Sequence, residues 1–266
     1  MNKYVKVFDI GLQNTFVYRW NFLLRSLFGL VPLAGSILIW RSIFASRGSD
    51  VAGYDYQSMV WYFLLIVLVD NLITPTEDEW QIAADIRDGQ MNAFLVKPLN
   101  YLAYRLSLFV SYRLLYTLFT LAPLAVLLWF FRSFIVLPAS PLTWAMSLFS
   151  LVMAGLIQFL VAYSLAMMAF WILEISTIIF ILYSFEYFLS GQVFPLDIMP
   201  HWIQSTLHYL PFTYELFFPI SIFLGKATGP NLWSGLAIQA GWLLIVWLTA
   251  RSMFRNGVRH YQAVGG

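Results

Sequence analysis

The sequence predicts an all-α integral membrane protein with six transmembrane helices. Hydrophobic residues make up 61% of the 266 positions and charged residues only 11%, and the mean hydropathy is +0.74. A soluble domain is roughly half apolar and a quarter charged, so this chain has too much apolar surface for one water-soluble core. The apolar runs are unbroken and do not alternate, which argues against a β-barrel.

The N-terminal segment, residues 1–20, predicts an amphipathic helix in the membrane interface. Its apolar residues recur at helical spacing, with polar residues on the other faces; they are Val5, Phe8, Leu12 and Phe16. The first long apolar run begins only near Phe22, so we expect no cleavable signal peptide. The alternative for this segment is a frayed tail.

Six apolar runs follow that are long enough to cross a bilayer. A spanning helix needs about 20 residues for a hydrocarbon core of about 30 Å. The predicted spans are 23–44, 57–74, 102–131, 142–168, 170–193 and 231–251. In the first, Arg25 and Arg41 bracket the apolar centre and can extend to opposite interfaces.

The distribution of Lys and Arg predicts the orientation. With the N-terminus inside, only four of the 15 Lys and Arg residues fall outside, namely Arg41, Arg47, Arg132 and Lys226. By the positive-inside rule, both termini are therefore expected in the cytoplasm. The expected location is the plasma membrane, the inner membrane of a bacterium.

A charged segment, residues 76–98, follows the second span on the cytoplasmic side. Thr76 and Glu79 have the spacing of a capping box, which predicts a helix start. Along this helix, Asp78, Asp85 and Asp88 share a face, and Gly89 is a natural stop. From the charges alone, a solvated cytoplasmic loop fits equally well.

The stretch "IRDGQMNAFLVKPLN" gives this segment a second interpretation. It resembles the signature of type-2 ATP-binding cassette exporter permeases (the ABC-2 membrane family), with Arg87, Gly89, Leu95 and Pro98 at the matching positions. The resemblance implies a coupling helix that docks in a groove of an ATPase subunit. The implied coupling residues are Glu77, Asp78, Glu79, Asp85, Arg87, Asp88, Gly89, Phe94 and Leu95.

A second stretch, residues 190–225, resembles the outer segment of the same family. The positions that carry the likeness are Gly191, Phe194, Pro195, Pro200, Trp202, Pro211, Phe212 and Tyr214. The resemblance implies short outer helices over 194–225 that re-enter the membrane before the last span. Prolines at these positions also break a chain into short pieces by themselves.

The resemblance implies partners, because the chain lacks the nucleotide-binding motif G-x-x-x-x-G-K-[ST]. ATP and Mg²⁺ would be bound by two separate cytoplasmic ATPase subunits. A second permease subunit, identical or paralogous, and membrane lipids would complete the assembly. The net charge of +2 gives no basis for a nucleic-acid partner, and the absence of cysteine excludes disulfides. The sequence leaves drug, lipid, glycan and peptide cargo open.

Three acids lie in or near the apolar spans, where ionisable groups are costly and often functional. Asp70 is expected to pair with Arg105 or Arg113 rather than to bind substrate. Glu174 is expected at the interface. Glu186 lies deeper, and it is the candidate for the pathway or the subunit interface, against a satisfied core acid.

A relay through these three acids would suit an ion- or proton-coupled secondary transporter, which is the alternative function. The inverted repeats that would favour it are not apparent. His201 and His208 are seven residues apart, about 10 Å along a helix, which is too far to chelate one metal ion. No catalytic motif occurs, so no catalytic residue and no metal site are assigned.

Overall fold

A computed structural model describes residues 3–16, 19–47, 51–75 and 78–261, and helices dominate it. Among these residues, five helices are long and apolar enough to cross a membrane. They are α2 (Arg19–Arg47), α3 (Tyr56–Ile73), α6 (Tyr101–Phe130), α7 (Pro141–Met167) and α11 (Gly229–His260). The predicted all-α fold is confirmed, and so are five of the six predicted spans as long apolar helices.

The predicted span 170–193 is shorter than expected. It contains α8 (Ser176–Leu189), whose 14 residues rise about 21 Å. The 3₁₀ turn η2 (Met168–Phe170) precedes it, and the backbone from Trp171 to Ile175 is not helical. The apolar composition continues through this region although the helix does not. Hydropathy alone therefore does not show where the backbone turns.

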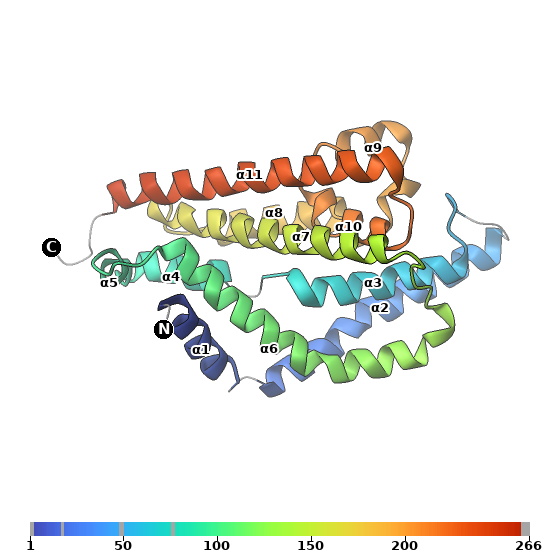
Figure 1. Ribbon diagram of the computed structural model, residues 1–266, viewed down its shortest axis with the longest axis horizontal. Coiled ribbons are helices and arrows are strands. Elements are labelled where there is room, and N and C mark those ends of the chain that lie inside the picture. Colours follow the sequence, from blue (N-terminus) through green and yellow to red (C-terminus); the bar gives the residue numbers. More distant parts are fainter. Residues whose placement is uncertain (1–2, 17–18, 48–50, 76–77, 262–266) are drawn as a thin grey trace.

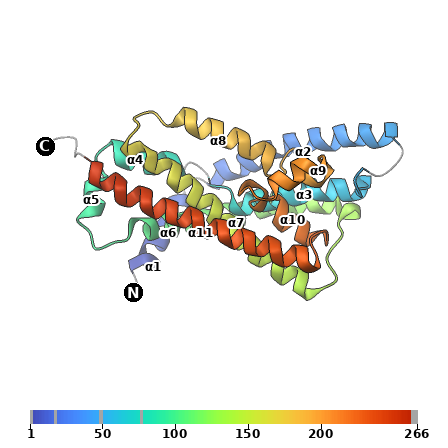
Figure 2. The ribbon, with the colours of Figure 1, turned by 90° about the horizontal axis from the view of Figure 1, so that it is seen from above.

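The helices form an elongated bundle (Figure 1). The helices α1 (Lys3–Phe16), α4 (Asp78–Arg87) and α5 (Met91–Leu95) lie at one end with the last turns of α11; we call this the α5 end. The helix α9 (His201–Leu207) lies at the opposite end, with the end of α6 and the start of α7; we call this the α9 end. Seen from above, α8 and α2 follow one long edge and α11 the other (Figure 2).

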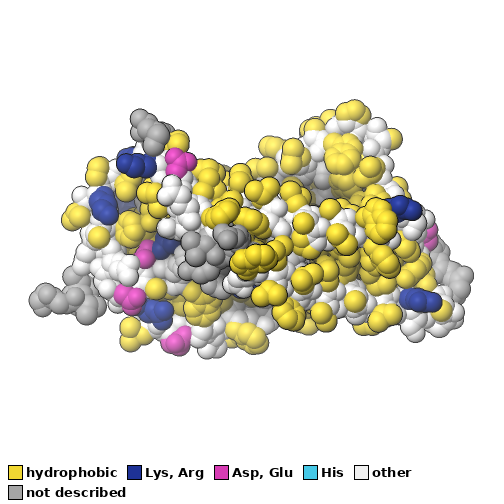
Figure 3. Space-filling model, turned by 90° about the horizontal axis from the view of Figure 1, so that it is seen from below, with side chains coloured by type: hydrophobic (Ala, Val, Ile, Leu, Met, Phe, Trp, Pro, Cys, Tyr) yellow, Lys and Arg dark blue, Asp and Glu magenta, His cyan; other side chains and the backbone are white. Residues whose placement is uncertain are grey.

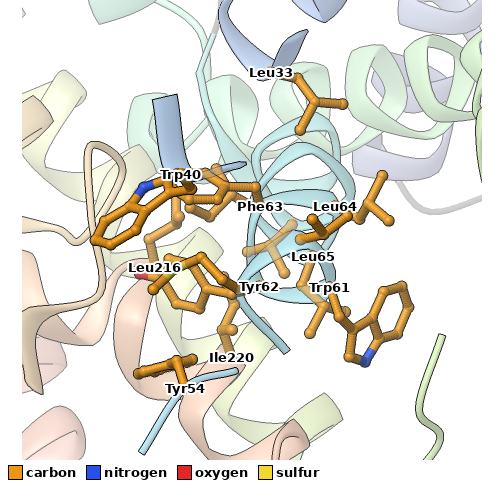
Figure 4. Packing of buried hydrophobic residues seen from close by; sticks show 14 of the residues in the cluster. Leu33, Trp40, Tyr54, Trp61, Tyr62, Phe63, Leu64, Leu65, Leu216 and Ile220 are labelled. Atoms are coloured by element: carbon orange, nitrogen blue, oxygen red, sulfur yellow. The ribbon is translucent and has the colours of Figure 1, made fainter. Parts of the chain in front are cut away.

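The central helix is α3, which is buried around its whole circumference over residues 59–66. Tyr62, Phe63 and Leu65 pack with Trp40 of α2 and with Leu216 (Figure 4). A helix that is apolar on every face is expected to be enclosed by other helices or lipid. Here protein surrounds it.

A second interface joins α7 to α11. Gln239 of α11 is fully buried and donates to the backbone carbonyls of Ser150 and Tyr214, each at 2.9 Å. The helix α11 continues to His260, past the predicted end at 251. This extension packs on the α5 end, where Phe254 stacks on Tyr101 with ring centroids 5.8 Å apart.

The N-terminal helix α1 lies across α6 at the α5 end. The two backbones approach at Gly11, where an added Cβ would come within 2.2 Å of the Ser111 hydroxyl. Within the described residues, the predicted segment 1–20 forms α1 from Lys3 to Phe16, and α2 begins at Arg19. The position of α1 in the membrane interface stays a prediction.

The surface has the pattern of a membrane protein. In Figure 3 hydrophobic side chains cover the middle of the molecule, and the charged side chains gather at the two ends. Such a belt suits the hydrocarbon core of a bilayer.

Candidate functional site

The charged segment forms two short helices at the α5 end. The helix α4 ends at Arg87, and Gly89 then turns the chain with φ +77° before α5 begins. The left-handed region favours glycine, so the predicted stop at Gly89 is confirmed. Thr76 and Glu77 lie outside the described residues, so the predicted capping box stays untested.

One face of α4 packs on α7 and η2. Ile82, Ala83 and Ile86 are buried on it, and so are two acids, Glu79 and Asp85. The acids Asp78, Asp85 and Asp88, predicted to share a face, do not form one exposed surface, because Asp85 points into the protein while Asp88 is exposed. Helical spacing alone does not show which side of an amphipathic helix a neighbour covers.

Asp85 is held by two side chains of α6. Arg105 forms a salt bridge with its carboxylate, and the Tyr101 hydroxyl donates to the same oxygen at 2.6 Å. Arg105 Nε also donates to that hydroxyl at 2.9 Å. The three groups satisfy one another, as a buried charge requires. This buried triad fixes α4 to α6.

The sequence predicts Arg105 or Arg113 as the partner of Asp70, but Arg105 pairs with Asp85 instead. Asp70 accepts a hydrogen bond from the Thr74 hydroxyl at 2.7 Å. Of the two expected partners, Arg113 is the one on which the charge of Asp70 acts.

The opposite face of this segment is open. We define the coupling tip as its exposed side chains Arg87, Asp88, Leu95, Val96 and Lys97. Leu95 is 43% exposed and Val96 84% exposed. Phe94 instead packs inward against the rings of Tyr101 and Tyr104, with centroids 5.1 and 4.9 Å apart. An apolar pair flanked by both charge signs is a surface that a protein partner can cover.

The N-terminal helix braces the chain just after the coupling tip. The Lys3 ammonium donates to the Pro98 carbonyl, and the Asn100 N–H donates to the Tyr4 hydroxyl at 3.2 Å. The Asn100 side chain in turn caps α6 by accepting from the Ala103 N–H at 3.0 Å. The coupling segment is thus held on both sides, by α1 and by the buried triad.

A polar cavity of about 290 Å³ opens between α2, α3 and α6. Asp70, Asn71 and Arg113 line it, together with Arg25. Arg113 also donates to the Asn71 carbonyl at 3.4 Å. Charged groups inside a transmembrane bundle usually face protein or a water-filled space, so this cavity is a candidate part of a transport pathway.

The other two acids lie far apart, Glu174 ahead of α8 and Glu186 within it. Glu174 is exposed ahead of α8 and accepts from the Ser176 hydroxyl and from the Ser176 N–H at 2.9 Å. These two bonds hold the pKa of that carboxyl below its usual range. Glu186 is half-buried and accepts from Gln158 of α7 at 3.1 Å. From Ser176 to Glu186 the helix rises about 15 Å, so a relay through Asp70, Glu174 and Glu186 is not assembled.

Sequence reasoning missed Glu215, which is fully buried between η4 (Phe212–Tyr214) and α10 (Phe217–Phe223). Its side chain faces Glu186. The available signal was a single acid within an aromatic run, "FTYELFF". The same run belongs to the stretch that resembles the outer segment.

The outer segment consists of short helices, as predicted. Pro195, Pro200 and Pro211 stand directly before η3 (Leu196–Ile198), α9 and η4. Proline lacks an N–H, which a helix start does not need. Pro219 lies within the first turn of α10, where the same reason applies.

The segment then returns into the bundle. The helix α10 packs beside α7 and α3 with residues 218–222 buried. Gly191 has φ +92°, and its carbonyl accepts from the Tyr62 hydroxyl at 2.6 Å. The Phe217 N–H donates to the Ser190 carbonyl at 2.9 Å. These contacts fix the start of the outer segment to α3 and α10; whether the segment re-enters a bilayer stays a prediction.

Two further outer residues, Phe194 and Tyr214, have structural partners. Phe194 packs against the core around α3, and the Tyr214 hydroxyl donates to the His208 carbonyl at 2.8 Å. Within the described part of the chain, no group of His, Cys, Asp and Glu side chains could hold a metal ion.

A family model described as "ABC-2 family transporter protein" matches residues 30–265. The match contains the whole coupling segment, Asp70 of the polar cavity, and the outer segment. No curated protein is similar enough to count as a match. Proteins of this family are the membrane component of ABC transporters and lack the ATPase cassette. The chain belongs to the ABC-2 family of transporter proteins.

Proposed function

We propose that the chain is the permease subunit of an ATP-driven exporter in the plasma membrane. The α5 end faces the cytoplasm with both termini, and α8 lies in the membrane as the sixth helix. Two separate ATPase subunits bind ATP and Mg²⁺. A second permease subunit, identical or paralogous, completes the pathway.

The observation that carries this proposal is the exposed coupling tip and the buried triad that holds the segment behind it to α6. Its exposed apolar pair, Leu95 and Val96, stands on a segment that the buried triad fixes to α6. A force applied to the tip would therefore move α6 and α7 rather than bend a loop. Such transmission needs packed elements that shift as units.

The edge along α8 supports a second permease subunit. Phe180, Phe185 and Phe188 are 73%, 59% and 56% exposed on this helix. The polar cavity also lies toward this edge, since Tyr187 and Gln192 line it together with α2 residues. Cargo would pass between two subunits that meet along α8 and α2, and lipid would cover the remaining apolar surface.

The coupling tip is tested by charge insertion. Changing Leu95→Glu and Val96→Glu together should abolish recovery of the ATPase with the tagged permease, because each apolar side chain buried at an interface contributes about 1.5–3 kcal/mol. The matched control changes Val136→Glu and Leu137→Glu, an apolar pair at the α9 end that is 55% and 60% exposed. The control should recover the ATPase undiminished. Equal recovery from both variants would contradict the proposal.

The orientation is tested by cysteine labelling. The chain has no cysteine of its own, so single residues can be introduced. Asn92→Cys at the α5 end should react with a membrane-impermeant reagent only after the membrane is opened, and Thr228→Cys before α11 should react in intact cells. The opposite pattern would reverse the proposed orientation.

A further inference from the structure

Glu215 is an unpartnered acid in the interior of the bundle. Its side chain is fully buried, and neither carboxylate oxygen receives a hydrogen bond from an N–H or O–H donor. An ionised carboxylate without such partners is strongly disfavoured in a low-dielectric interior. Buried groups of this kind therefore point to a bound ligand or a bound proton.

The group within hydrogen-bonding reach of Glu215 is another carboxyl, that of Glu186 on α8. Gln158 supplies one donor to Glu186, at 3.1 Å. The other charged groups that act most strongly on Glu186 are Asp70 of α3 and Glu79 of α4, which are both acids. Tyr183, one turn before Glu186, is hydrogen-bonded to Glu79. Among the described residues, the groups that act most strongly on the pair are acids or the neutral Gln158, and none of them is a cation that would balance two negative charges.

Two carboxylates in contact repel each other, and in a low dielectric they cannot both be ionised. A single proton removes the conflict, because one group then donates an O–H bond that the other accepts. We propose that Glu186 and Glu215 together form a binding site for one proton, which is taken from water. The pair keeps one negative charge, and Gln158 hydrogen-bonds to it.

The site lies between α8 and the chain that enters α10. The outer end of α8 is tied to α10 through Ser190 and Phe217, while much of the rest of α8 is exposed. Glu186 belongs to α8 and Glu215 to the chain entering α10. If α8 moves relative to α10 during transport, the carboxyls separate and the shared proton is released or replaced. This inference goes beyond the exporter proposal and does not require an ATPase.

Infrared spectroscopy of the purified permease in lipid nanodiscs tests the site directly. At neutral pH the wild type should show the C=O band of a protonated carboxylic acid, which shifts in heavy water. Glu215→Gln and Glu186→Gln should each remove that band entirely, because the remaining carboxylate can accept from the new amide and needs no proton. The matched control, Glu174→Gln, changes the exposed acid ahead of the same helix and should leave the band unchanged.

Each outcome decides the proposal. Loss of the band in both single variants supports one proton shared by the two acids. A band that persists in either variant would mean that an acid is protonated independently, and absence of the band in the wild type would mean that no proton is bound. Both results would overturn the proposal. Normal melting temperatures of the variants exclude unfolding as the cause.

Discussion

The α5 end of the bundle contains the ion pair Asp85–Arg105, and the α9 end contains the ion pair Asp197–Lys226. The side chains of the first pair are 12% and 7% exposed, and those of the second are 28% and 27% exposed. Each end also has a glycine with positive φ. Gly89 turns into open space, whereas an added Cβ at Gly191 would lie 2.7 Å from the Tyr62 hydroxyl.

The comparison shows that the ends are stabilised in different ways. At the α5 end, a buried charge network fixes a segment whose backbone turn is free. At the α9 end, a buried backbone turn fixes a segment whose charges remain near solvent. Buried charges must keep every partner, while solvated charges need none. We therefore expect substitutions of similar chemistry to have very different effects at the two ends.

The largest effect is expected from Arg105→Met. It leaves Asp85 buried with one neutral donor, Tyr101, and breaking a buried pair in this way costs about 3–5 kcal/mol. The purified permease should melt at a much lower temperature. The double variant Asp85→Asn with Arg105→Met removes the unpaired charge, so it should recover much of the stability. A single variant as stable as the wild type would show that the network does not hold the α5 end.

The next effect is expected at the turn of the α9 end. Gly191→Ala introduces a left-handed alanine and a Cβ against Tyr62, which should cost about 1–3 kcal/mol. The matched control is Gly89→Ala, where φ is also positive but no atom lies within 4 Å of the added Cβ. The control should lose less stability, because it has the backbone strain without the clash. Equal losses would mean that packing around Tyr62 contributes nothing.

The comparison also separates what the sequence could predict from what it could not. Apolar runs, the stop at Gly89 and the prolines of the outer segment act locally, so the chain itself shows them. The sequence pattern alone places Asp85 on a partner surface, because the groups that cover it, Tyr101 and Arg105, belong to another helix. Glu215 was missed for the same reason, since its neighbour Glu186 is distant in sequence. Burial of charge depends on tertiary contacts, which periodicity does not contain.

A smaller effect is expected from the helix caps. Asp55 caps α3 by accepting from the Ser58 hydroxyl and from the Ser58 N–H at 2.8 Å, and these two bonds lower the pKa of Asp55. Asp55→Ala should cost about 0.5–2 kcal/mol. Because the folded pKa is depressed, this stability is present above the ordinary pKa of about 3.9 and is lost as the pH falls through the folded value.

The cap at the α5 end supplies the control. Asn100→Ala removes a neutral cap of α6, so its cost should not depend on pH. Melting temperatures measured down to acidic pH should show the Asp55→Ala deficit shrinking and the Asn100→Ala deficit constant. Parallel curves would contradict the assigned role of the Asp55 carboxylate.

The smallest effect is expected from Lys226→Met, which removes the exposed pair of the α9 end. Lys226 donates to Asp197 at 2.9 Å and lies over the ring of Tyr54. Partial burial nevertheless lowers the pKa of Lys226, and Asp197 only offsets this in part. A half-solvated pair contributes about 0–1 kcal/mol, so the melting temperature should change little at neutral pH.

Between the folded pKa of Lys226 and the ordinary value of about 10.4, the unfolded chain binds more protons at this position than the folded chain. The stability of the wild type relative to Lys226→Met should therefore rise with pH in that window. A fall instead would show that the charged pair stabilises the α9 end, as the buried pair does at the α5 end.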